Sequence, residues 1–298
     1  MNKIKRNIGD RIFQVCNVLF LTLLILIGIV PFIHLLAVSL SSNAAASSGS
    51  VGLLPVNFTL ESYRYLFSKS EFIRSFFISV ERVILGTIVN MTLIILTAYP
   101  LSKEKEVFRA RKFYVWFFVI TMFFSGGMIP VYLIVKYTGL LNTIWALILP
   151  GALNVWNMIL LLNFFRNVPK ELEEAAIIDG ANHRQILWHT YLPVSLPALA
   201  TILLFVIIGH WNAWFDGILY LSFTDQYPLQ SYLSTIVMTS NSKAAQVVSP
   251  EQLERMKNIS DKSLKSAEIF MGALPIMLVY PFMQKYFIKG IVIGSVKG

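Results

Sequence analysis

Six apolar stretches, each about as long as a membrane-crossing helix, constrain this 298-residue chain more than any other feature. The hydrocarbon core of a bilayer needs about 20 mostly apolar residues in a helix. Hydrophobic residues make up 56% of the chain and charged residues 14%, whereas a soluble domain usually carries about 25% charged residues. We therefore predict an all-α membrane protein with six transmembrane helices in a single domain, residues 1–298. The stretches are approximately residues 13–40, 83–101, 113–135, 144–165, 198–221 and 269–287.

The first stretch follows a basic N-terminus and admits a second interpretation, a cleaved signal peptide. Its apolar part is longer than the ~7–15 residues usual in such peptides, so we expect a retained helix. The small residues Ala44, Ala45 and Ala46 would permit cleavage, and this alternative stays open.

Positive charge is distributed unevenly among the predicted loops. The net charge is +9; with six spans, 15 Lys and Arg residues lie on the side of both termini and nine on the other, with Arg82 at a boundary. Loops rich in Lys and Arg tend to remain in the cytoplasm. Both termini and the loop at 166–196 are therefore predicted to be cytoplasmic, and loops 41–73 and 224–268 extracytoplasmic. The surplus indicates orientation in a membrane and gives no reason to expect a nucleic-acid partner.

The two extracytoplasmic loops are expected to contain little regular structure. In the first, an irregular linker rich in Ser, Ala and Gly precedes a short helix at about residues 60–67. In the second, Pro250 begins a segment of mixed charge that suits a short surface helix, because proline is favoured in the first helical turn.

Groups that perform catalysis are scarce in the sequence. The four histidines, His34, His183, His189 and His210, lack a metal-ligand spacing with nearby acids, and no Gly is followed by Lys, so a phosphate-binding loop is absent. The lone Cys16 excludes an intramolecular disulfide. We expect no catalytic residue, metal or cofactor in this chain, and ATP and Mg²⁺ to be bound by partner subunits. A membrane-embedded enzyme or an assembly scaffold is the remote alternative.

The loop between the fourth and fifth stretches carries the most specific pattern. Pro169 suits the start of a short helix, and Gly180 can take the positive φ that ends one. A second short helix is predicted from about Asn182 to Leu192, ending at Pro193 because proline disfavours helix at the residue before it. Residues 169–193, here called the EAA-type segment, thus form two short helices joined by a turn.

Three motifs in this segment carry a resemblance to a known family. Glu174-Ala-Ala, Asp179-Gly-Ala and Leu192-Pro193 resemble the EAA loop of permease subunits of binding-protein-dependent, type I ABC importers. Thr190 departs from the usual isoleucine at its position. Residues 98–103, 124–130, 139–150, 211–214 and 289–298 further resemble sugar-type permeases, namely the smaller maltose-transporter permease and the polysaccharide and aldouronate permeases.

The resemblance implies partners and contact residues. The chain would form a heterodimer with a second permease in a bacterial cell membrane, with two ATPase subunits and an extracytoplasmic binding protein that delivers oligosaccharide. A different solute, such as a peptide or an amino acid, is the alternative. The resemblance implies ATPase coupling through Glu174, Ala175, Ala176, Asp179, Gly180, Arg184, Leu192 and Pro193, and an ATPase contact through the tail residues Gly294, Ser295, Lys297 and Gly298.

Polar and aromatic residues within the spans are candidates for the translocation path. Amides bind sugar hydroxyls and aromatic faces stack on sugar rings, which suits weak and transient contacts. The same residue types also serve as interhelical contacts and interface anchors. The candidates are Asn154, Asn157, Trp211, Asn212, Trp214 and Asp216.

Overall fold

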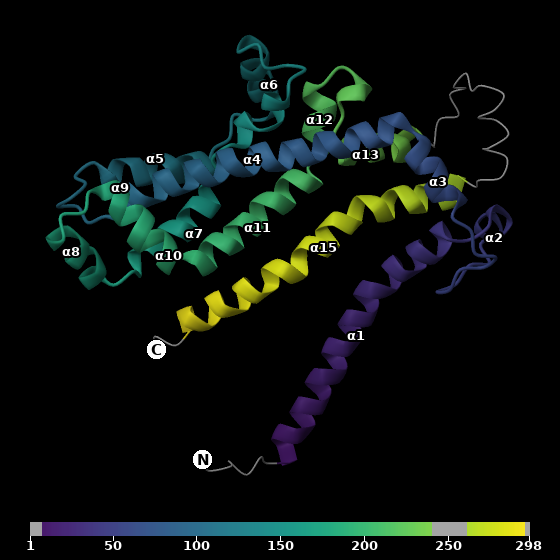
Figure 1. The fold of residues 1–298 in the computed structure, drawn as a ribbon, viewed down its shortest axis with the longest axis horizontal. Helices are drawn as coiled ribbons and strands as arrows, with labels where there is room; N and C mark the ends of the chain where they lie inside the picture. The colour runs from purple at the N-terminus through teal and green to yellow at the C-terminus, as the bar shows by residue number, and fades with distance from the viewer. Residues whose placement is uncertain (1–7, 240–260, 296–298) are drawn as a thin grey trace. The chain divides into compact units, whose positions relative to one another are not determined.

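A computed structural model describes residues 8–239 and 261–295, and every regular element in these ranges is helical (Figure 1). The chain divides into two compact units, one formed by residues 1–70 with 239–273 and the other by residues 71–238 with 274–298. Three helices are long and apolar enough to cross a membrane, and up to six spans result if each bent helix pair is one span. The chain is thus an all-helical membrane protein.

The first unit contains α1 (Ile8–Ser39), α2 (Asn43–Ser48), α3 (Glu61–Ser68) and the beginning of α15 (Asp261–Ser295). The most apolar window of α1 has no residue buried within the chain. Such an all-round apolar surface suits lipid or another subunit. Helices α3 and α15 are joined by a hydrogen bond of 2.6 Å between the Ser62 and Ser263 hydroxyls and by a Lys69–Glu268 ion pair at 3.5 Å.

The helix predicted near residues 60–67 is confirmed as α3, whereas the preceding linker is more ordered than expected. Helix α2 interrupts it and ends at Gly49, whose φ is +73°. Ala45 and Ala46 of α2 are buried against Ala37, Val38 and Val51. The surface helix predicted at Pro250 lies outside the described residues.

The second unit holds the remaining elements and the larger core. Ile94, Leu161 and Ile202, from α4, α7 and α11, are almost fully buried in this core. It also receives residues of the EAA-type segment, so this segment and three spans share one packed interior. The elements are α4 (Ser70–Ser102), α5 (Arg111–Phe123), α6 (Met128–Tyr137), η1 (Ile144–Leu147), η2 (Leu149–Gly151), α7 (Val155–Arg166), α8 (Lys170–Ile178), α9 (His183–Ile186), η3 (Leu187–Tyr191), α10 (Leu192–Val194), α11 (Leu196–Asn212), α12 (Phe215–Tyr220), η4 (Thr224–Gln226) and α13 (Leu229–Thr239).

Three of the predicted spans contain breaks that their apolar composition conceals. The stretch 113–135 bends by 114° between α5 and α6, where Gly127 has a φ of +83°. In 144–165, two 3₁₀ turns around Pro150 precede α7, with a bend of 52°. The stretch 198–221 is interrupted after Asn212, since Ala213 is extended and α12 starts anew.

Candidate functional site

The EAA-type segment forms two short helical pieces joined at Gly180. Gly180 has a φ of +78°, and the Ala181 N–H donates to the Ala176 carbonyl at 2.9 Å, which closes α8 in the way that glycine-ended helices favour. Asn182 then caps α9 through a reciprocal pair of hydrogen bonds with Gln185, at 3.0 and 2.8 Å. Two paired caps explain why so short a turn is well defined.

The predicted end of the second short helix at Pro193 is wrong. The chain stays helical from His183 to Val194, with a π-helical turn over Leu187–Tyr191, and bends by 84° before α11. A wide turn ahead of Pro193 relieves the clash between a proline ring and the carbonyl one turn earlier. The helix therefore continues through the proline.

The eight residues predicted for ATPase coupling fall into two groups. Ala176 packs against the core of the unit and Leu192 is buried in it. Next to the turn, the apolar side chain of Ile178 is 85% exposed, so the outer surface of the segment is not purely polar. The exposed members are Glu174, Ala175, Asp179, Gly180, Arg184 and Pro193.

A cluster that sequence patterns did not reveal holds the segment to the end of α4. The Lys103 ammonium is 2.5 Å from the Glu173 carboxylate of α8, and it lies 4.3 Å and 4.1 Å from the ring centroids of Tyr99 and Tyr191. The Tyr191 hydroxyl donates to the second Glu173 oxygen at 2.5 Å. We call these four residues the Lys103 cage.

Electrostatics in the Lys103 cage follow from its burial. Burial lowers the pKa of the Lys103 ammonium, and the hydrogen bond and charge of Glu173 partly offset this effect. For Glu173, burial raises the pKa, but the hydrogen bonds from Lys103 and Tyr191 and the charges of Lys103 and His183 together outweigh burial, so the pKa is lowered overall. The carboxylate thus stays charged. From the sequence, Lys103 was counted among the residues that set orientation and lay in the segment 98–103 that resembles sugar-type permeases, but no pairing with Glu173 was predicted.

A second ion pair joins α4 to α12. Arg82 is 2% exposed and contacts both carboxylate oxygens of Asp216. Its guanidinium also donates to the carbonyls of Ala213 at 3.2 Å and Leu147 at 3.3 Å. Both carbonyls lie where regular helix is interrupted, so Arg82 satisfies backbone groups that a broken span would otherwise leave unpaired.

A polar cavity of ≈ 380 Å³ lies beside this pair. Three of the six residues predicted for the translocation path line it: Asn154, Asn157 and Asp216. The other three do not. Trp211 is buried with its ring edge-on to Phe76, and Asn212 and Trp214 lie outside the cavity lining. Asn154 is the N-cap of α7, and its side chain accepts from the Asn157 N–H at 3.0 Å.

Two further polar residues of the cavity wall, Asn90 and His210, were not among the predicted ones. Oriented to satisfy its neighbours, the Asn90 amide donates to the carbonyls of Gly86 and Ala152 at 3.1 Å and accepts from the His210 ring at 3.2 Å. A Cβ on Gly86 would come within 2.4 Å of that ring. Gly86 therefore permits α4 and α11 to approach closely enough for the Asn90–His210 contact.

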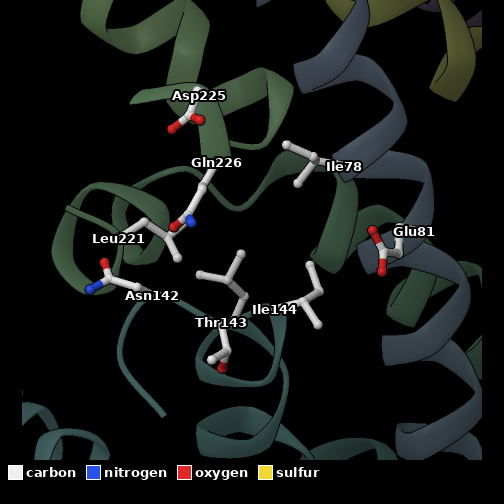
Figure 2. Close-up of a pocket in the computed structure, with 9 residues that line it drawn as sticks. Ile78, Glu81, Asn142, Thr143, Ile144, Leu221, Asp225 and Gln226 are labelled. Atoms are coloured by element: carbon white, nitrogen blue, oxygen red, sulfur yellow. The ribbon is translucent and has the colours of Figure 1, made fainter. Parts of the chain in front are cut away.

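A separate pocket of ≈ 210 Å³ lies among the beginning of α4, the loop before η1 and the segment around η4. Glu81, Asn142, Asp225 and Gln226 contribute polar groups to its lining (Figure 2). None of the six residues predicted for the translocation path lines this pocket. Of the two cavities, only the larger one is lined by predicted path residues, and by three of the six.

Known proteins resemble this chain over nearly its whole length. Residues 1–293 match the family described as "Binding-protein-dependent transport system inner membrane component". The chain is 41% identical to protein LplC of Bacillus subtilis, covering 97% of this chain and 96% of LplC. It is also 41% identical to the polygalacturonan/rhamnogalacturonan transport system permease protein YtcP of the same organism, covering 97% and 99% of the two chains.

A solved structure extends the likeness to the fold. The crystal structure of a bacterial ABC transporter involved in the import of the acidic polysaccharide alginate contains a chain that matches with a TM-score of 0.86 and 33% identity. The match covers 96% of this chain and 100% of that one. With its all-helical fold and its EAA-type segment, the chain belongs to the family of inner-membrane permease components of binding-protein-dependent ABC importers.

Proposed function

We propose that this permease subunit carries oligosaccharides, with uronate-containing oligosaccharides as the favoured class. The observation that carries the proposal is the full-length similarity to a polygalacturonan/rhamnogalacturonan permease and to a chain of an alginate importer. The cavity supports it, because the side-chain amides of Asn154 and Asn157 in its lining are groups suited to hydrogen bonding with sugar hydroxyls. A peptide or an amino acid is the alternative solute.

The proposed assembly is a single-domain permease paired with a second permease, two ATPase subunits and an extracytoplasmic binding protein. Both termini, the EAA-type segment and the tail would then face the cytoplasm. The ATPases bind ATP and Mg²⁺, and this chain contributes no cofactor.

We propose that the outer surface of the EAA-type segment contacts an ATPase subunit. Its exposed residues lie around the Gly180 turn, and the largely exposed Ile178 offers apolar area that a partner would cover. A second contact is proposed for the tail. Gly294 and Ser295 are the last described residues of α15, and Lys297 and Gly298 lie outside the described residues.

The solute class is tested with the complete importer in proteoliposomes. ATPase stimulation and uptake are measured with the cognate binding protein in the presence of oligogalacturonate, alginate oligomers, maltodextrin or a peptide mixture. We expect stimulation by one or both acidic oligosaccharides. Stimulation by peptides alone would contradict the proposal, and stimulation by maltodextrin alone would retain the oligosaccharide class but exclude the uronate preference.

Asn154 provides a test of the cavity as part of the translocation path. Asn154→Ser preserves an N-cap but removes the amide, so stability should be unchanged while uptake falls. Asn154→Ala should lower both, because losing an N-cap side chain costs about 0.5–2 kcal/mol. Uptake is measured as initial rate per folded complex, and folding as the thermal midpoint in detergent. Full uptake by Asn154→Ser would contradict a role of Asn154 in the translocation path and would show that it serves only as the N-cap of α7.

A further inference from the structure

The Lys103 cage connects the EAA-type segment to the end of a membrane-spanning helix through a buried ion pair. Lys103 is 6% exposed and directly follows α4, while Glu173 lies on α8. A buried ammonium without a counter-charge is strongly unfavourable, so the two side chains constrain each other's position. A shift of α8 must therefore carry the end of α4 with it or break this pair.

Aromatic packing makes the connection stiff. Tyr99 and Tyr191 pack edge to face at 5.1 Å, and Phe165 packs edge-on against both, at 6.4 Å from Tyr99 and 5.4 Å from Tyr191. The ammonium over two ring faces adds cation–π attraction. Rings from α4, α7 and the helical piece before α11 thus pack together, and two of them contact the Lys103 ammonium.

An ion pair between the same two segments provides a contrast. Lys170, the first residue of α8, pairs with Glu104, which follows Lys103 in the chain. Both side chains are mostly exposed, at 71% and 59%. Exposed pairs of this kind contribute little to the position of the groups they join. The buried pair, and not the exposed one, is therefore suited to carry force.

We propose that Lys103 is a positioning residue that locks α8 to the end of α4, so that movement of the EAA-type segment against the ATPase is transmitted to this span. The proposal rests on the proposed ATPase contact of the segment. It assigns to the cage the step between that contact and the rearrangement of the membrane helices.

The experiment compares Lys103→Met with Lys170→Met in the complete importer. Methionine keeps most of the apolar volume between the two tyrosine rings and removes the charge. We expect Lys103→Met to assemble and retain basal ATPase activity, while stimulation by the loaded binding protein falls at least about fivefold, at the lower end of common allosteric couplings. Uptake should fall in parallel. In Lys170→Met, both the stimulation of the ATPase by the loaded binding protein and the uptake should remain within about twofold of the wild-type values.

Hydrogen exchange of the assembled complex supplies a readout that needs no solute. Amides of residues 170–178 should exchange faster in Lys103→Met than in wild type, with no change in Lys170→Met. Wild-type coupling and exchange in Lys103→Met would overturn the proposal. If Lys103→Met fails to assemble, the same measurements of stimulation and exchange are made on Glu173→Gln. The amide of this variant still accepts from the Tyr191 hydroxyl but carries no charge. If the wild-type importer shows no stimulation with any sugar, the proposed solute class fails, and the exchange comparison still tests the cage.

Discussion

Replacing Gly180 with valine is expected to abolish stimulation of the ATPase by the loaded binding protein while leaving membrane insertion intact. Gly180 has a φ of +78°, and apart from its chain neighbours a Cβ built on it meets no atom of the described residues within 4 Å. Within the chain, the cost is therefore conformational, about 1–3 kcal/mol for a non-glycine residue in such a region. If stimulation falls by more than this conformational cost explains, the additional loss would come from a clash between the valine side chain and the ATPase surface that contacts the turn. ATPase activity and uptake of the reconstituted complex measure it.

Gly139→Val provides the matched control for this prediction. Gly139 has a φ of +71°, and its Cβ likewise meets nothing within 4 Å, so the conformational cost is alike. It lies after α6, outside the EAA-type segment, and stimulation should persist in any complex that folds. Equal loss of stimulation in both variants would show that strain alone is responsible. Full stimulation in Gly180→Val would contradict the assignment of this turn to the ATPase contact.

Much of the fold was predictable because its strongest determinants are local. Long apolar runs, the glycine turn at Gly180 and a helix start near Asn182 each depend on neighbouring residues. The described helices confirm the positive φ at Gly180 and the start of the second helix, whereas the capping box of Asn182 was not predicted. The breaks within the spans were concealed, since an interrupted helix and a straight one have the same apolar composition. Gly127 and Pro150 marked two of these breaks, but glycine and proline are also frequent in uninterrupted membrane helices.

The polar contacts of the site were less predictable because they join distant segments. Arg82 and Asp216 are separated by 134 positions, and Lys103 and Glu173 by 70. Nothing in the sequence states that one cation pairs with one particular anion. Asn154 and Asn157 were found because they are near each other in sequence, whereas Asn90 and His210 come from α4 and α11 and were missed. Asp216, a charged residue inside the predicted stretch 198–221, was the available signal, since such residues are rarely without a partner.

Arg82→Met is expected to cause the largest loss of stability among single substitutions in the described part of the chain. It would leave the Asp216 carboxylate without its cation and the carbonyls of Leu147 and Ala213 without a donor. Breaking a buried ion pair from one side costs about 3–5 kcal/mol. Because the Asp216 side chain is 27% exposed, water can partly replace the lost cation. We therefore expect a loss of stability near the lower end of this range. The thermal midpoint of the detergent-purified complex measures the change.

Two further variants separate the ion pair from general damage to α4. Arg82→Met/Asp216→Asn removes the unpaired charge and should recover part of the loss, with a coupling energy of about 0.5–3 kcal/mol. Arg74→Met breaks the exposed Arg74–Asp225 pair, in which both side chains are more than half exposed, and should cost no more than about 1 kcal/mol. If Arg82→Met and Arg74→Met shifted the midpoint equally, Arg82 would not be the residue that stabilises the break between α11 and α12. If the buried pair stabilises the break in the helix, Arg82→Met lowers the thermal midpoint more than Arg74→Met does, and adding Asp216→Asn restores part of the difference.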